Sequence, residues 1–168
     1  SCGGTIRTHY DDILADSPAL LARYEKIKER VYELTDFLAT VAKLDKLPSA
    51  NPGAFKGKVT YHDSCCGLRE LGVQSQPREL IARRDGVELT EMHNARQCCG
   101  FGGTFAVKYG DISKAIVDEK CENIHATGAD AVVLGDLGCM LNIEGRLRRT
   151  GDTKTRVLHV AQVLAGDA

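Results

Sequence analysis

The sequence predicts an α/β fold: a parallel sheet of about four strands with helices on both faces, preceded by a long amino-terminal helix. From Lys58 onward, short β-rich runs alternate with helical patterns, and such alternation is typical of parallel strands joined by helical crossovers. Before that point the apolar residues recur at helical spacing. With 168 residues, the chain is long enough to bury a core without disulfides.

The amino-terminal part predicts two helices. A short one spans Ile6 to Leu14, and a long amphipathic one begins at Pro18, with Ser17 as its cap, and continues to about Lys43. Its apolar residues follow three- and four-residue steps: Leu20, Tyr24, Ile27, Val31, Leu34, Leu38 and Val41. A loop rich in Pro and Gly, residues 48–53, then separates a helical segment (residues 1–53) from an α/β domain (residues 54–168).

The α/β domain contains four predicted strands and four predicted helices. The strands are Val59–His62, Val87–Met92, Ala131–Leu134 and Arg156–Val160. The helices are Gly67–Leu71, Pro77–Arg84, Ile112–Thr127, which Gly128 ends, and Cys139–Arg149.

Cysteines follow three of these strands. The first strand leads to Cys65 and Cys66, the second to Cys98 and Cys99, and the third to Cys139. Because open parallel sheets place ligands at the carboxyl ends of their strands, we expect these thiols at one edge of the sheet. Thiolates at helix amino-termini are stabilised by the helix dipole, and the glycines at 100, 102 and 103 permit positive φ and close backbone approach.

The composition argues against several other classes of protein. The 22 basic and 23 acidic residues give a net charge of −1, which does not indicate a nucleic-acid partner. No apolar run approaches the roughly 20 residues of a membrane span, so we expect a cytoplasmic protein. Seven cysteines, two pairs of them adjacent, favour metal or redox chemistry over disulfides in such a chain.

The cysteine spacing resembles the CCG cysteine-rich domain family, which includes heterodisulfide reductase and glycolate oxidase iron-sulfur proteins. The family pattern is a cysteine, a spacer, Cys-Cys-Gly, a second spacer and Cys-x-x-Cys. Here Cys65 and Cys98 are separated by 32 residues (66–97), and Gly100 and Asp136 by 35 (101–135). Asp136 stands in place of the first cysteine of the final pair.

Longer stretches look like the lactate-utilisation branch of this family, carboxy-terminal copy. They are residues 60–65, 67–72, 98–105, 135–142 and 145–147. The resemblance implies an iron-sulfur cluster of the 4Fe-4S type bound by Cys65, Cys98, Cys99 and Cys139. It also implies that Ser1 to Gly4 end a missing first lobe and that the helical segment joins the two lobes.

The resemblance further implies an electron-transfer subunit of a complex that oxidises L-lactate to pyruvate, with other subunits of that complex as partners. This chain would have no substrate site of its own, and without its first lobe it could be empty of metal. A glycolate oxidase type iron-sulfur subunit, a structural zinc module and a metal-free thiol-disulfide device are the alternatives.

Four further residues have open roles. Cys66 could replace Cys65 as a ligand, and Asp136 could bind metal or cap the helix that follows it. His62 could bind metal or contact a sulfur. Cys121 lies within a helix at a spacing that matches no motif, so we expect it to be a packing residue.

Overall fold

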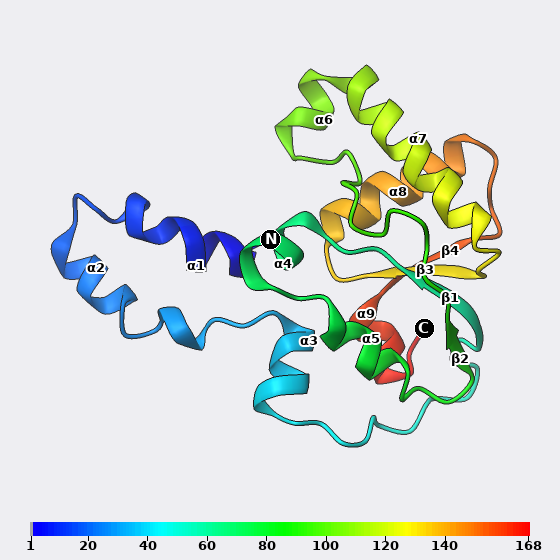
Figure 1. Cartoon of the computed structure of the whole chain (residues 1–168), viewed down its shortest axis with the longest axis horizontal. Coiled ribbons are helices and arrows are strands. Elements are labelled where there is room, and N and C mark those ends of the chain that lie inside the picture. Colours follow the sequence, from blue (N-terminus) through cyan, green and yellow to red (C-terminus); the bar gives the residue numbers. More distant parts are fainter. Residues whose placement is uncertain (1) are drawn as a thin grey trace.

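The computed structural model describes residues 2–168, and its strands form one four-stranded parallel sheet (Figure 1). In sheet order the strands are β2 (Val87–Leu89), β1 (Gly57–Tyr61), β3 (Ala131–Leu134) and β4 (Arg156–His159). The predicted fold class is therefore confirmed. Strands β2 and β4 end earlier than expected, and β3 has the predicted bounds.

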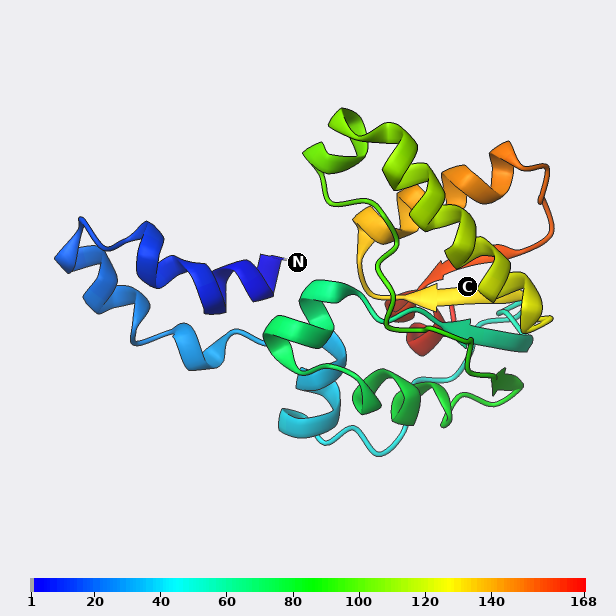
Figure 2. The ribbon, with the colours of Figure 1, turned by 45° about the horizontal axis from the view of Figure 1, so that its top comes forward.

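Helices lie on both faces of this sheet. The helices of this part of the chain are α4 (Cys65–Leu71), α5 (Ser75–Ile81), α6 (Thr104–Lys108), α7 (Gly110–Ala126), α8 (Leu137–Arg149) and α9 (Val160–Ala165). In Figures 1 and 2, α7 and α8 cover one face, whereas α5 and α9 cover the other. The short helices α6 and α9 were not predicted.

Strand β3 shows why the sequence forms this sheet. All four of its residues are buried, since it lies between β1 and β4 and is covered on both faces. Successive side chains point to opposite faces: Val132 and Leu134 join the apolar cluster beneath α7 and α8, while Ala131 and Val133 join the cluster beneath α5 and α9.

The same alternation in β1 directs one polar side chain toward α7 and α8. Val59 and Tyr61 pack in the cluster beneath α5 and α9. The next residue, His62, extends the ladder, with its backbone N–H donating to the carbonyl of Val133 at 3.0 Å. The period of two then places its imidazole on the opposite face, where the cysteines lie.

The predicted continuous helix from Pro18 to Lys43 is wrong. The structure has α1 (Cys2–Ile13), α2 (Pro18–Tyr24), η1 (Lys28–Arg30), α3 (Leu34–Asp36) and the π-helical turn η2 (Phe37–Val41). As Figures 1 and 2 show, α1 and α2 form an arm that extends away from the sheet. Ser1 lies outside the described residues, and Cys2 to Gly4 belong to α1.

Two side chains account for the break in that helix. The hydroxyl of Tyr24 donates to the carbonyl of Ile6 at 2.6 Å, so α2 folds back onto α1. The carboxylate of Glu33 accepts from the N–H groups of Thr35 and Asp36 and starts a new helix there. Apolar residues of the predicted stripe, such as Leu20 and Ile27, are exposed. The apolar residues do recur at helical spacing, but no single surface of the protein packs against all of them.

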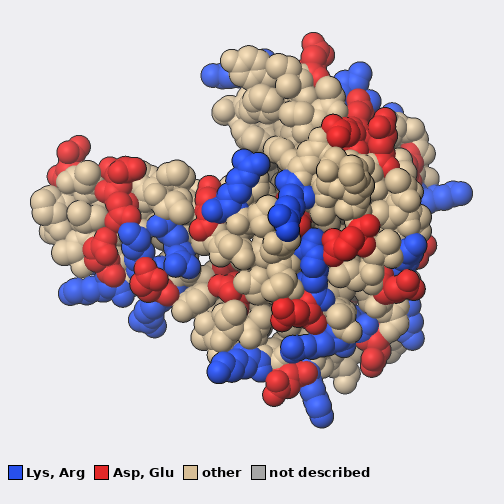
Figure 3. Space-filling model, viewed as in Figure 1, with Lys and Arg blue, Asp and Glu red and all other residues tan. Residues whose placement is uncertain are grey.

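The surface carries mixed charge, and it includes an apolar tip. On the face drawn in Figure 3, basic and acidic side chains are interspersed, whereas the tip formed by α6 and the start of α7 is mostly uncharged. Val107, Tyr109 and Ile112 are exposed there. Across residues 2–168, none of the helices combines the length and apolar character that crossing a membrane requires.

Candidate metal centre

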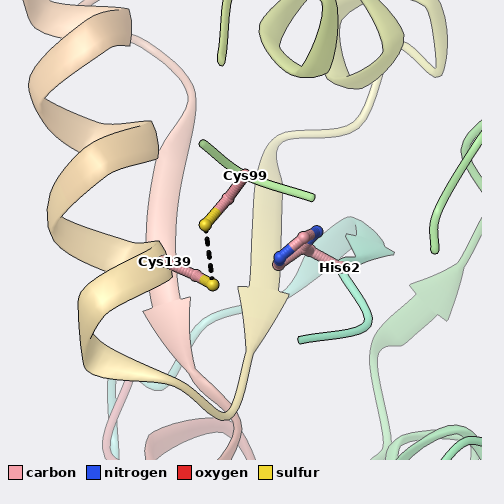
Figure 4. Close-up of side chains that lie close together, drawn as sticks. All are labelled: His62, Cys99 and Cys139. Carbon is pink, nitrogen blue, oxygen red and sulfur yellow. Dashed lines mark hydrogen bonds between the residues drawn. The ribbon is translucent and has the colours of Figure 1, made fainter. Parts of the chain in front are cut away.

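His62, Cys99 and Cys139 converge at the carboxyl edge of the sheet (Figure 4). A ring nitrogen of His62 and the sulfurs of the two cysteines all lie within 4.8 Å of one another, and all three residues are buried. The two sulfurs are 2.8 Å apart and share a hydrogen bond. A set of one nitrogen and two sulfur donors at this spacing suits a soft or borderline metal.

Three different elements bring these side chains together. His62 follows β1, Cys99 lies in the loop between β2 and α6, and Cys139 is in the first turn of α8. The side chain of Asp136 caps α8 and accepts from the N–H groups of Gly138 and Cys139, at 3.0 and 3.2 Å. The sequence allowed Asp136 to be either a helix cap or a metal ligand, and in the structure it is a helix cap.

A hydrogen bond between their sulfurs couples the two buried cysteines. The hydrogen bond from Cys139 lowers the pKa of Cys99, and a contact with His62 lowers it further, while burial opposes both effects. The same hydrogen bond, together with burial, raises the pKa of Cys139. The two shifts have opposite directions, so Cys99 is the member of the pair that loses its proton more readily, and metal ligation requires such deprotonation.

His62 lacks the hydrogen bonds that a buried histidine usually makes. Its side chain is fully buried, and neither ring nitrogen has a hydrogen-bond partner among the described residues. Buried polar atoms without partners are rare, and each needs an explanation such as an ion. An imidazole beside two sulfurs, whose acceptor nitrogen has no hydrogen-bond donor among the described residues, is consistent with a metal-bound centre.

The loop around Cys98 depends on glycine. Gly100 has φ of +83°, its N–H donates to the sulfur of Cys98 at 3.3 Å, and a Cβ on it would lie 2.6 Å from the carbonyl of Ser113. The Ser113 hydroxyl donates to the Gly100 carbonyl, and the Asn142 amide donates to the Cys99 carbonyl, each at 2.8 Å. A backbone N–H group, that of Gly100, thus faces the sulfur of Cys98, as the glycines predicted.

Cys65 and Cys66 occupy the first turn of α4, which Ser64 caps by accepting from the N–H of Gly67. Both cysteines are half-buried, and neither belongs to the group of His62, Cys99 and Cys139. A thiolate at Cys65 nevertheless raises the pKa values of Cys98 and Cys139 through its charge, although burial or a hydrogen bond has the larger effect on each. Burial is also the main reason that the pKa of Cys66 rises to about 11.

Cys121 is buried in the apolar cluster beneath α7 and α8, and burial raises its pKa to about 11. This environment agrees with the packing role that its spacing predicted.

Two charged residues next to the centre were not predicted. The buried carboxylate of Asp63 pairs with both terminal nitrogens of Arg78, at 2.7 and 2.9 Å. The side chain of Lys120, on α7, is fully buried behind the loop that leads to Cys98. Asp63 follows a predicted strand, and this position could have indicated a residue close to the centre. Lys120 lies in a helix among other charged residues, and nothing in the sequence distinguishes it from them.

Residues 59–144 match the model of the CCG family, described as a cysteine-rich domain. The chain belongs to this family. The matched residues include the whole candidate metal centre.

Relatives that carry the name Lactate utilization protein A match most of the chain. The protein from Bacillus cytotoxicus is 42% identical over 164 residues, which cover 98% of this chain and 66% of that protein. The protein from Halalkalibacterium halodurans is 41% identical over 155 residues, which cover 92% and 62%. The Geobacillus kaustophilus protein is 42% identical, with coverage of 98% and 66%. The chain thus spans slightly less than two thirds of the length of these relatives.

Proposed function

We propose that this chain holds an iron-sulfur centre that carries electrons in lactate utilisation. The observation that supports it most is the buried group of His62, Cys99 and Cys139, in which no described residue forms a hydrogen bond with the histidine ring and a hydrogen bond joins the two sulfurs. The similarity to relatives named Lactate utilization protein A supports the choice of process.

The proposed ligands are Cys65, Cys98, Cys99 and Cys139. Cys99 and Cys139 form the buried half of the set, and Cys65 and Cys98 are half-buried. When bound, an iron-sulfur cluster would accept and donate single electrons at a potential that its surroundings determine. We assign His62 a role beside the sulfurs rather than among the four ligands.

The chain's own residues would position this centre and exclude water from it. The apolar cluster beneath α7 and α8 encloses Cys99 and Cys139 and excludes water. Asp136 holds the first turn of α8, and the Gly100 N–H donates to the sulfur of Cys98. Hydrogen bonds to sulfur and low solvent exposure are two means by which a protein tunes a cluster's potential.

The wider role follows from the relatives' name and remains a proposal. We propose that the electrons come from oxidation of L-lactate to pyruvate by other subunits of a cytoplasmic complex. Glycolate as the electron source, as in the related glycolate oxidase subunits, is the alternative.

A zinc site is the second candidate, because His62, Cys99 and Cys139 already offer three ligands of the types that zinc prefers. Cys98 or Cys65 would then complete a tetrahedral set. In this case His62 would bind the metal directly.

Purification without oxygen, followed by a visible spectrum and analysis for iron, acid-labile sulfide and zinc, separates these functions. The proposal is supported by the presence of iron and sulfide together with broad absorption at about 400 nm, which is expected for sulfur-to-iron charge transfer. Stoichiometric zinc without sulfide supports the second candidate. Protein that contains neither contradicts both and favours thiol-disulfide exchange among the cysteines.

Substitution of the buried ligands tests the assignment of residues. Cys98→Ser, Cys99→Ser and Cys139→Ser should each abolish bound iron and sulfide, because a hydroxyl is a poor ligand for a soft centre. Cys121→Ala is the control, since Cys121 is buried in the same apolar cluster as Cys99 and Cys139 but does not belong to the group of candidate ligands. It should keep the iron and cost about 1 kcal/mol in the free energy of unfolding.

A further inference from the structure

The side chain of Lys120 points from α7 into the protein and ends at the loop that leads to Cys98. The residue has 0% exposure to solvent. Its Nζ donates to the carbonyls of Asn94 at 2.7 Å and Ala95 at 3.4 Å, and it lies 3.9 Å from the sulfur of Met92. All three partners are acceptors, one for each N–H of an ammonium group. The contacts therefore fit the charged form.

This charge has no carboxylate beside it. Among residues 2–168, no acidic side chain lies within ion-pair distance of Lys120, and the nearby carboxylate of Asp63 is already paired with Arg78. The other groups whose negative charge would act on Lys120 are the sulfurs of Cys99, Cys139 and Cys98. Burial lowers the pKa of Lys120, and these negative groups oppose that shift. A buried charge is costly unless opposite charge compensates it.

Lys120 also joins two parts of the centre. The carbonyl of Ala95 accepts from Lys120 and from the backbone N–H of Asp63, at 3.2 Å for the latter. Ala95 lies three residues before Cys98, and Asp63 follows His62. Asn94, which holds the shortest contact, has φ of +55°. The ammonium group thus fixes a strained loop against the end of β1.

We propose that Lys120 is a positioning residue whose ammonium group compensates the negative charge of the occupied thiolate centre. This inference rests on the proposed function and deepens it, because it requires an occupied centre with net negative charge. A zinc ion bound by His62 and three thiolates, from Cys99, Cys139 and either Cys98 or Cys65, would carry one excess negative charge, and that charge could not change because zinc has no redox chemistry. Four thiolates around an iron-sulfur cluster leave negative charge in excess, which a buried cation stabilises.

The expected consequence concerns the reduction potential. Adding an electron makes the centre more negative, so the ammonium group stabilises the reduced form more than the oxidised form. Removing the charge should make the midpoint potential more negative without removing the centre. A residue that only held the loop would instead change how much centre is bound.

The test compares Lys120→Met and Lys120→Gln with Lys114→Met in protein purified without oxygen. Lys114 is exposed on the same helix, so its replacement removes an equal charge at a solvated position. Iron and sulfide per chain are measured first, and the midpoint potential is then measured by redox titration. We expect both Lys120 variants to keep wild-type iron and sulfide and to have a more negative potential, with no shift in the Lys114 variant.

Three results would overturn this inference. The first is a wild-type potential in Lys120 variants that contain the full centre. The second is a wild-type potential in Lys120→Gln alone, because glutamine can donate to the carbonyls but carries no charge. The third is failure of both neutral variants to fold, which would show that Lys120 has a structural role. Wild-type protein without iron and sulfide contradicts the proposed function itself, and is recognised before any variant is measured.

Discussion

At the scale of single residues, the four proposed ligands differ in burial: Cys99 and Cys139 are buried, whereas Cys65 and Cys98 are half-buried. Cys99 and Cys139 pack in the core on one side of the sheet, and a hydrogen bond between their sulfurs couples them. Cys65 and Cys66 lie next to each other on α4, at the rim. The choice between Cys65 and Cys66 as the ligand on α4 is therefore the part of the assignment that substitution tests best.

The comparison of Cys65→Ser with Cys66→Ser addresses this choice. We expect Cys65→Ser to lose bound iron and Cys66→Ser to keep it, because Cys65 has the family spacing and its charge acts on both Cys98 and Cys139. Iron per chain and the visible spectrum are the measurements. The opposite pattern would show that the ligand position on α4 is displaced by one residue.

At the scale of elements, helix ends place the chemistry. α8 begins at Leu137, with Asp136 as its cap, and Cys139 lies in its first turn. Gly138 must be small there, because a Cβ would lie 2.5 Å from the ring of Phe101. The start of α8 is therefore determined by one cap and one close contact.

Asp136→Ala and Asp136→Asn separate capping from metal ligation. Asn caps about as well as Asp, whereas Ala lacks an acceptor, so Ala should lower the free energy of unfolding by about 1 kcal/mol and Asn by much less. Chemical denaturation measures both. If Asn keeps the stability but loses iron, Asp136 is a ligand as well as a cap.

The turn between α8 and β4 predicts a pH dependence. Asp152 accepts from the N–H groups of Thr155 and Lys154, at 3.0 and 2.8 Å, and contacts His125 at 2.8 Å. Hydrogen bonding to Thr155 contributes most to a lowered pKa of this carboxyl in the folded protein. A lowered folded-state pKa stabilises the protein above the unfolded value of about 3.9, and this stabilisation is lost as the pH falls toward the folded value.

Asp152→Ala should therefore cost about 1–2 kcal/mol at pH 7 through the lost hydrogen bonds. The difference from wild type should shrink below about pH 4, where the carboxyl group starts to take up a proton. Urea denaturation at several pH values measures this difference. A difference that stays constant down to about pH 2 would contradict the assigned role of the carboxylate.

At the scale of the whole molecule, stability should come from the two apolar layers that the sheet separates. Ile143 on α8 is fully buried above the sheet, whereas Leu141, two residues earlier, is 69% exposed. Ile143→Ala should lower the free energy of unfolding by about 2–5 kcal/mol. Leu141→Ala should change it by about 0.5 kcal/mol or less. Equal effects on denaturation midpoints would mean that α8 does not pack as described.

The fold class was predictable because the periods of the sequence reflect local geometry. Residues 131–134 form a short, β-rich apolar run, which favours a strand buried on both faces, and the structure has β3 at those residues. The meeting of Cys99 and Cys139 was predictable, since parallel strands bring their carboxyl ends to one edge. In the structure these two cysteines come together there with His62, one of the residues whose role the sequence left open, whereas the gathering of all four cysteines stays a prediction.

The sequence alone determined which residues are apolar, which positions suit caps and tight turns, and which thiols follow strands, because these properties depend on neighbouring residues. Tertiary structure decided what covers each surface. It broke the segment from Pro18 to Lys43 into short helices, since Tyr24 packs against α1 and Glu33 starts a new helix. It also buried Lys120 behind the cysteine loop, because burial depends on contacts between residues far apart in the chain, here between α7 and residues 92–95.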